Sequence, residues 1–325
     1  MGYSIAIRTL GTSGEKFKQE LDSIAAQTVK PDKVVVYIAE GYAHPQYTIG
    51  IEQYVEVKNG MVAQRALPYD EIDSEYILLL DDDIKLAPDS AERMLHAIKE
   101  YHLTCVAVDL FQDHAMPILK KLKAMIASLN FPHLSNKWAF KIHADASFSY
   151  NINPTKDLYL SQSAAGAVCM WVKNDFLALR YEDELWMDSM GFAYNDDTVI
   201  FHKIVKNGYS LGVLYNTGSL HLDGKTSSAG YQKNIQRFYT RSKASTIIWY
   251  RICYDLPTNT IWQKIWAVVA YSIKCLWLFF INLAACIPFK SLKVVGLYVK
   301  GIVDGLKLVG SKEYKAIPNY IVKIK

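Results

Sequence analysis

The stretch Tyr76-Ile77-Leu78-Leu79-Leu80-Asp81-Asp82-Asp83-Ile84 joins five apolar or aromatic residues directly to three carboxylates. An apolar run of this length is too short for a buried helix. It predicts a strand covered on both faces, as in a parallel sheet. Ligands of open α/β sheets bind just outside the carboxyl ends of such strands. We therefore expect a ligand site where this strand ends.

The three adjacent carboxylates repel one another, so their charge needs a cation, a basic partner or water. Hard oxygen ligands on a short turn suit Mg²⁺ or Mn²⁺, ions that usually bind together with substrate phosphates. A solvated strand end with capping acids is the alternative. A calcium loop is excluded, because Leu86 stands where that loop needs Gly and Lys85 replaces a ligand.

Predicted strands and helices alternate on both sides of this stretch. Strands are expected over residues 3–9, 33–39, 54–57, 103–110, 164–172 and 210–215, and helices over 15–27, 88–99 and 199–206. This order favours an α/β fold with a parallel sheet that binds a nucleotide. Residues 112–160 follow no clear pattern and are expected to form an excursion over the site.

The charge of the chain is divided unevenly. The chain has 325 residues, 51% of them hydrophobic, enough for one large domain and an appendage. Residues 243–325 carry 12 Lys and Arg against 3 Asp and Glu, whereas the preceding 242 residues carry 24 against 29. An acidic body with a basic, apolar tail argues against nucleic-acid binding and suits anionic lipid.

The five cysteines are scattered and show no metal-binding spacing, which favours free thiols in a reducing cytoplasm. The first residues lack the apolar segment of a secretory signal, in keeping with that location.

Five short motifs resemble, in this order, those of the family-2 glycosyltransferases. They are Ser4-Ile5-Ala6-Ile7-Arg8-Thr9; Ser23-Ile24-Ala25-Ala26-Gln27 with Arg65; Leu80-Asp81-Asp82-Asp83; Gly166-Ala167; and Asp196-Asp197 followed by Lys206-Asn207-Gly208-Tyr209. The form Asp-Asp-Asp-Ile, with a later Asp-Asp and a His, is most similar to the galactofuranosyltransferase branch.

The resemblance implies the GT-A fold, an α/β nucleotide-sugar-binding domain whose mostly parallel central sheet is flanked by helices. This domain is expected over residues 1–225. A helical connector over 226–260 would complete the site, and residues 261–325 would form a helical, membrane-associated tail.

The implied activity is metal-dependent, inverting transfer of a sugar from a UDP-sugar to a glycan acceptor. The leaving diphosphate needs a cation, and the acceptor hydroxyl needs a general base. Asp81, Asp83 and His221 are the expected ligands of Mn²⁺ or Mg²⁺, since a His nitrogen suits Mn²⁺ better. Asp82 is expected to reach ribose or sugar hydroxyls. A structural role is the alternative for His221.

Asp197, with Asp196 beside it, is the expected catalytic base. Counting back from Gly208 aligns this pair with the acidic pair of the family. Two acids ahead of a helix are also typical capping residues, and the two roles are compatible. A neighbouring carboxylate raises the pKa of one member of the pair towards a useful value.

Three residues are expected to contact the UDP-sugar. Thr9 would contact the base, Glu40 would accept the uracil N–H, and Arg65 would contact the nucleotide or its diphosphate. Glu40 departs from the family pattern, because Ala39-Glu40-Gly41-Tyr42 stands where Asp-Asp-Gly-Ser is common. An exposed helical arginine is the alternative for Arg65. Trp186 is expected either to stack on an acceptor sugar or to pack in the core.

Residues 265–288 are mostly apolar over 24 positions, long enough to cross a bilayer. Lys274 lies mid-run, at a cost of about 3 kcal/mol on insertion scales. We expect a helix on an anionic membrane surface, with a single span or a soluble dimerisation helix as alternatives. The expected location is the cytoplasmic face of the plasma membrane. The expected acceptor is a lipid-linked glycan. The protein could also form a homo-oligomer, and the sequence leaves this question open.

Two other functions remain open at this point. A nucleotidyltransferase uses a related sheet, although residues 11–16 lack the usual phosphate-loop spacing. A membrane-tethered, non-catalytic sugar-nucleotide-binding protein is the other.

Overall fold

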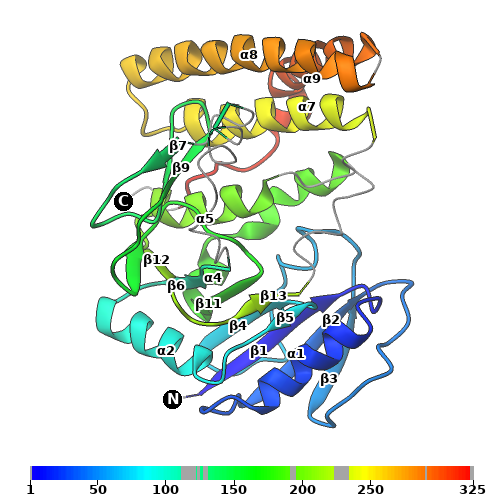
Figure 1. The fold of residues 1–325 in the computed structure, drawn as a ribbon, viewed down its shortest axis with the longest axis vertical. Coiled ribbons are helices and arrows are strands. Elements are labelled where there is room, and N and C mark those ends of the chain that lie inside the picture. Colours follow the sequence, from blue (N-terminus) through cyan, green and yellow to red (C-terminus); the bar gives the residue numbers. More distant parts are fainter. Residues whose placement is uncertain are drawn as a thin grey trace.

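The computed structural model describes residues 2–110, 122, 125–126, 131–190, 195–222, 234–289 and 291–322. Within these residues, eight strands form one sheet in the order β10-β12-β6-β11-β4-β1-β2-β3 (Figure 1). The strands are β1 (Tyr3–Thr9), β2 (Lys33–Ala39), β3 (Glu52–Val57), β4 (Tyr76–Asp81), β6 (Cys105–Val108), β10 (Leu158–Leu160), β11 (Val168–Val172) and β12 (Leu211–Leu214).

The sheet is mostly parallel, as predicted. β3, β2, β1 and β4 run parallel to one another, and β6 runs parallel to β12. β11 lies between β4 and β6 and is antiparallel to both, and β10 is antiparallel to β12. β11 begins at Val168, four residues later than expected, and residues 164–167 lie outside the strand.

The region expected to be an excursion is divided between two sheets. β7 (Phe131–His133), β8 (Phe140–Ile142) and β9 (Phe148–Asn151) form a small sheet of their own, whereas β10 belongs to the main sheet. Residues 111–121, 123–124 and 127–130 lie outside the described part of the chain.

Helices bury both faces of the main sheet. Helices α1 (Glu15–Ala25) and α2 (Ser90–Tyr101) bury apolar residues against one face, where Phe17, Leu21 and Met94 share a core with β1 and β4. Helices α4 (Lys173–Ala178) and α5 (Asp196–Lys206) share a second core with the opposite face. The apolar strands are therefore covered on both sides, as their sequence requires.

The C-terminal helices stack beyond α5. They are α7 (Arg237–Trp249), followed by the π-helical turn η2 (Tyr250–Tyr254), then α8 (Ile261–Phe289), α9 (Lys293–Val309) and α10 (Lys312–Lys315). Figure 1 shows α8 as the outermost layer, with α7 and then α5 between it and the sheet. Tyr320 returns to α5, where its hydroxyl donates to the Val199 carbonyl.

Candidate active site

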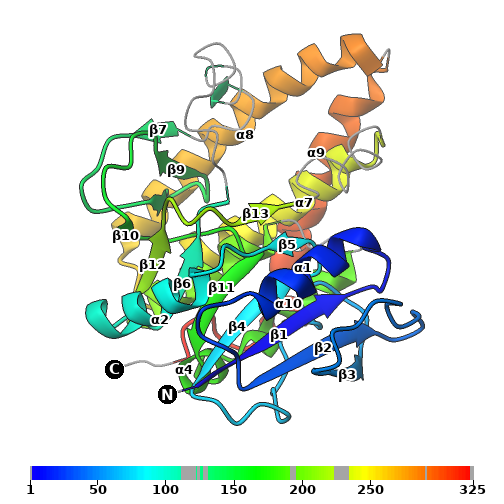
Figure 2. The same ribbon diagram turned by 60° about the horizontal axis from the view of Figure 1, so that its bottom comes forward.

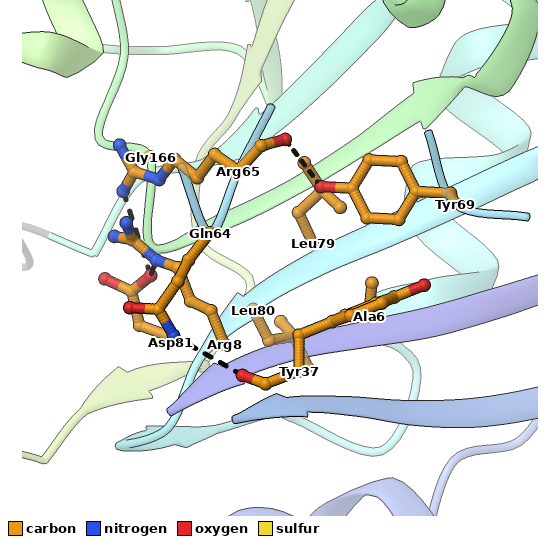
Figure 3. Close-up of a pocket in the computed structure, with 10 residues that line it drawn as sticks. All are labelled: Ala6, Arg8, Tyr37, Gln64, Arg65, Tyr69, Leu79, Leu80, Asp81 and Gly166. Carbon is orange, nitrogen blue, oxygen red and sulfur yellow. Dashed lines mark hydrogen bonds and ion pairs between the residues drawn. The ribbon is translucent and has the colours of Figure 1, made fainter. Parts of the chain in front are cut away.

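The carboxyl ends of β1 and β4 bring an arginine and the first acid of the triplet together. Arg8 and Asp81 are register partners in the parallel pair β1–β4, so their side chains leave the sheet side by side. The Arg8 guanidinium donates to the Asp81 carboxylate (Figure 3). Burial opposes ionisation of Asp81, but Arg8 and Arg65 outweigh it and lower its pKa.

Asp83 faces His221 across a two-stranded ribbon. The short strands β5 (Ile84–Lys85) and β13 (Leu220–His221) pair antiparallel, with His221 opposite Ile84. The Leu222 N–H donates to the Asp83 carbonyl at 2.9 Å, and His221 Nε2 lies 3.1 Å from Asp83 Oδ1. The ribbon therefore fixes a carboxylate oxygen and an imidazole nitrogen side by side.

Asp82 turns towards the end of β1. The Thr9 hydroxyl donates to Asp82 Oδ2 and accepts the Gly11 N–H at 2.7 Å. Burial raises the pKa of Asp82, with Asp81 and Asp83 adding to the effect against hydrogen bonds from Thr9 and Ser13. The acid is thus fastened to the loop after β1, where a nucleotide bound at the strand ends would lie.

Arg65 connects the triplet to the second acidic motif. Its side chain is 8% exposed, and Nη1 contacts Asp196 Oδ2 and, at 2.7 Å, Asp197 Oδ1. Its Nη2 lies 3.8 Å from Asp81 Oδ1. Burial opposes the charge of Arg65, yet these three acids outweigh burial and raise its pKa well above the ordinary value.

Asp196 and Asp197 begin helix α5 but differ in exposure. The side chain of Asp196 is 7% exposed, whereas that of Asp197 is 37% exposed. Burial, opposed by Arg65 and assisted by Asp197, raises the pKa of Asp196 to about 6. Asp197 therefore is the member of the pair that an acceptor can reach, and Asp196 is the member that anchors Arg65.

Gly166 leaves the space in which these charges meet. A Cβ at this position would lie 2.2 Å from Asp197 Oδ1 and 3.0 Å from Arg65 Nη2. Any side chain here would therefore displace the candidate base or its arginine.

A small pocket is lined by Arg8, Arg65, Asp81 and Gly166, together with Gln64 and aromatic residues (Figure 3). The Gln64 amide donates to the Thr9 carbonyl at 3.1 Å. The turn that carries Arg65 is held by Asp188, which accepts the Val62 and Ala63 N–H groups at 3.0 and 2.9 Å.

No family model matches the chain, and no curated protein matches its sequence. Among solved structures, the chain is similar to GalNAc-T7 in its crystal structure with UDP, GalNAc and Mn²⁺, at 12% identity and a TM-score of 0.51. That match covers 78% of this chain and 48% of GalNAc-T7. The crystal structure of S. aureus TarS matches at 12% identity and a TM-score of 0.53, over 98% of this chain and 50% of TarS.

The chain has the GT-A fold. It spans about half the length of each of these two proteins.

Within this GT-A fold, most of the residues predicted from sequence meet at one edge of the sheet. Thr9, Arg65, Asp81, Asp82 and Asp83 lie there with Asp196, Asp197 and His221. Glu40 follows β2 and is exposed, and its backbone N–H donates to the Val57 carbonyl. Trp186 packs against the core and donates its indole N–H to Glu184 at 2.8 Å, so the structure gives it the core position.

The sequence alone does not single out three residues of the site. In the sequence, Arg8 is only part of an expected strand, and its pairing with Asp81 depends on the register between β1 and β4. Gln64 and Asp188 carry no local signal, because their partners are backbone groups of distant segments.

Side-chain oxygen and nitrogen atoms decide whether the GT-A site can hold a metal ion. Asp83 and His221 offer converging oxygen and nitrogen donors, a combination suited to Mn²⁺. Asp81 is engaged by Arg8 and Arg65, so its predicted role as a ligand requires those arginines to move. Across the described residues, no three His, Cys, Asp or Glu side chains converge. Asp83 and His221 therefore fit as two of the ligands of such an ion.

Proposed function

We propose that the protein is a metal-dependent, inverting family-2 glycosyltransferase that moves a sugar from a UDP-sugar to a glycan acceptor. One observation carries the proposal: an exposed carboxylate, Asp197, is linked through Arg65 to the acidic triplet at the same edge of a GT-A sheet. The GalNAc-T7 structure, which holds UDP, GalNAc and Mn²⁺, supports a UDP-sugar and a manganese ion.

Asp83 and His221 would hold the divalent ion, which when bound takes up the charge of the leaving diphosphate. Arg8 and Arg65 supply further positive charge beside Asp81. Asp82 and Thr9 lie next to the loop after β1 and would contact the ribose and the base, with Glu40 as the acceptor of the uracil N–H.

Asp197 is the proposed general base. It takes the proton of the acceptor hydroxyl, whose oxygen bonds to the anomeric carbon on the side opposite the diphosphate. The bond from this carbon to the diphosphate oxygen breaks, UDP leaves, and the anomeric centre is inverted. Arg65 holds its Oδ1 atom at 2.7 Å and thereby fixes the direction of the carboxylate. Asp196 contributes by anchoring the same guanidinium from the buried side.

The proposed acceptor is a glycan on a lipid carrier at the cytoplasmic face of the plasma membrane, in the synthesis of a cell-surface polysaccharide. The apolar helix α8 and the basic C-terminal region support a membrane location.

A thermal-shift screen of UDP-sugars with and without Mn²⁺ tests the function, since a ligand that binds the folded state raises its melting temperature. We expect one UDP-sugar to raise the melting temperature only with Mn²⁺ and to be slowly hydrolysed to UDP. Release of pyrophosphate from a nucleoside triphosphate would instead indicate a nucleotidyltransferase. Metal-independent binding without turnover would indicate a non-catalytic sugar-nucleotide-binding protein.

A further inference from the structure

The outer face of α8 exposes apolar side chains along the whole helix. They recur every three or four residues and are 42 to 79% exposed: Trp262, Trp266, Val269, Ile273, Leu276, Phe280, Leu283 and Ile287. Val299, Val303 and Leu306 of α9 are also exposed, at 41 to 48%. The eight residues of α8 are called the outer apolar face below. Exposed apolar surface of this extent marks an interaction site.

The opposite side of α8 is fastened to the rest of the protein. Tyr271 stacks on Trp249 of α7 with ring centroids 4.2 Å apart, and Lys274 donates to the Asp145 carbonyl at 2.9 Å. At the end of α8, Phe289 meets Phe238 of α7 at 5.4 Å. Contacts to other elements therefore extend over most of the length of the helix.

This attachment decides how α8 can meet a membrane. Residues 261–287 are long and apolar enough to cross one by length and composition. A crossing would carry α7 and the segment around Asp145 into the hydrocarbon core, where their polar groups would lose water. In Figure 2, α8 and α9 form a hairpin, and its connection includes polar Ser291 next to Leu292 and Lys293. An arrangement in which both helices lie on a bilayer keeps these polar groups in water.

The pattern around the outer apolar face also argues against a coiled coil. Its spacing is heptad-like, but coiled coils carry charged residues beside the seam that select the partner. Here the flanking positions are Gln263, Ile265, Ala270, Ser272, Trp277, Phe279, Ala284 and Cys286. The face is broad and uncharged at its margins, as in helices that lie in a membrane interface.

Charge favours anionic lipid as the partner. Residues 261–309 contain six lysines and a single acid, Asp304. Lys274 is bound to the Asp145 carbonyl and Lys300 pairs with Asp304 at 2.6 Å, whereas Lys293 and Lys307 are exposed. Trp262 and Trp266 lie in the first turns of α8 and are 75 and 60% exposed, and tryptophan prefers the headgroup region. Apolar burial and lysine attraction to anionic headgroups therefore act together.

We propose that the outer apolar face docks on an anionic lipid bilayer, with α8 and α9 lying in the plane of the membrane. The inference is independent of the proposed reaction, because it rests on the C-terminal helices alone. α8 is the outermost layer of the molecule, so the remaining domain stays in water when this face is bound (Figure 1).

Flotation of the full chain with vesicles tests the proposal. We expect binding to phosphatidylcholine vesicles that contain phosphatidylglycerol, at least tenfold weaker binding to phosphatidylcholine alone, and weaker binding at high salt. Release from the vesicles by alkaline carbonate supports in-plane docking, whereas retention until detergent is added would overturn it. No difference between the two lipid compositions would also overturn it.

The double variant Ile273→Glu with Phe280→Glu is expected to reduce vesicle binding at least tenfold. A matched control is Ile51→Glu with Leu134→Glu, two residues 56 and 74% exposed outside this face, which should leave binding unchanged. Thermal unfolding establishes that each variant is folded, and UDP-sugar binding is followed separately. A dimer that forms without lipid and is broken by Phe280→Glu would overturn the proposal in favour of a second copy as the partner.

Discussion

Arg65 contacts carboxylates from two distant segments of the chain. Two of them, Asp196 and Asp197, begin α5, and the third, Asp81, ends β4. Because the guanidinium is planar and carries five donors, it can hold several carboxylate oxygens at fixed angles. The position of the candidate base therefore depends on a residue that lies outside both acidic motifs.

Replacing Asp197 by Asn tests the proposed base. The amide cannot accept the acceptor proton, so we expect the transfer rate to fall by about 10²–10⁴-fold. Binding of the UDP-sugar, measured by calorimetry, should change little. Asp73→Asn, at an exposed site before β4, is the control. Equal loss of binding and transfer would make Asp197 a donor ligand or a structural residue.

The pH dependence of transfer should reflect ionisation of Asp196. Burial raises the pKa of Asp196 to about 6, and its carboxylate must be ionised to pair with Arg65, which holds the candidate base. We therefore expect kcat/KM to rise with pH and to level off above about 6, and Asp196→Asn should remove this step from the profile. The measurement is the pH–rate profile of both proteins. An unchanged midpoint in the variant would separate Asp196 from the reaction.

At the scale of elements, the ribbon β5–β13 places His221 beside Asp83. We expect His221→Ala to weaken Mn²⁺ binding by about 10–100-fold, as loss of a metal ligand or its support does. Thermal-shift titration with Mn²⁺ in the presence of UDP measures it. His96→Ala is the matched control, because His96 is exposed on α2. Equal manganese affinity in the two variants would exclude His221 from the metal site.

Two glycines of α9 provide a matched pair for helix packing. A Cβ at Gly301 would lie 2.0 Å from Ser242 Oγ and 2.4 Å from the Tyr239 carbonyl of α7, whereas nothing lies within 4 Å of one at Gly296. Gly301→Ala should therefore lower the free energy of unfolding by about 1–3 kcal/mol through overpacking. Gly296→Ala should raise it by about 0.5–1 kcal/mol through helix propensity. Urea denaturation measures both, and equal effects would contradict the close crossing of α7 and α9.

The sequence predicts where some strands begin but not how all of them pair. β2 and β4 follow uninterrupted apolar runs, and their predicted starts at Lys33 and Tyr76 are confirmed. The direction of β11 and the separate sheet β7–β9 depend on which strands pair, and hydrophobic pattern does not encode that choice. The acidic triplet is recognisable because acids directly after an apolar strand are conspicuous, and Asp196-Asp197 is recognisable as an acidic pair ahead of a helix. Arg8 and Gly166 were not assigned roles, because their importance arises from contacts across the fold.

At the scale of the whole molecule, a buried ion cluster ties α5 to the C-terminal part of the chain. Glu184 lies between Lys203 of α5 at 3.0 Å and Arg251 of η2, and all three side chains are at most 4% exposed. Burial alone would raise the pKa of Glu184, but its hydrogen bonds and the two cations lower it. Arg251 also donates to the Pro318 carbonyl at 3.0 Å, which extends the cluster towards Tyr320.

Glu184→Gln leaves two buried cations without their counter-ion. We expect the free energy of unfolding at pH 7 to fall by about 3–5 kcal/mol, as when one partner of a buried ion pair is removed. Glu182→Gln, on the surface and 3.7 Å from Arg180, should change it by less than about 1 kcal/mol. Urea denaturation gives both values. Similar losses in the two variants would show that the cluster contributes no more than a surface pair.

Two hydrogen bonds hold helix α5 to the C-terminal segment of the chain. The Tyr320 hydroxyl donates to the Val199 carbonyl, and the Val322 N–H donates to Asn207 at 2.7 Å. The helix that begins with Asp196 and Asp197 obtains these partners only after more than a hundred further residues have left the ribosome. During translation, Asp196 and Asp197 therefore lack this support while α8 and α9 are being synthesised. The candidate active site is completed only after the apolar C-terminal helices have been made.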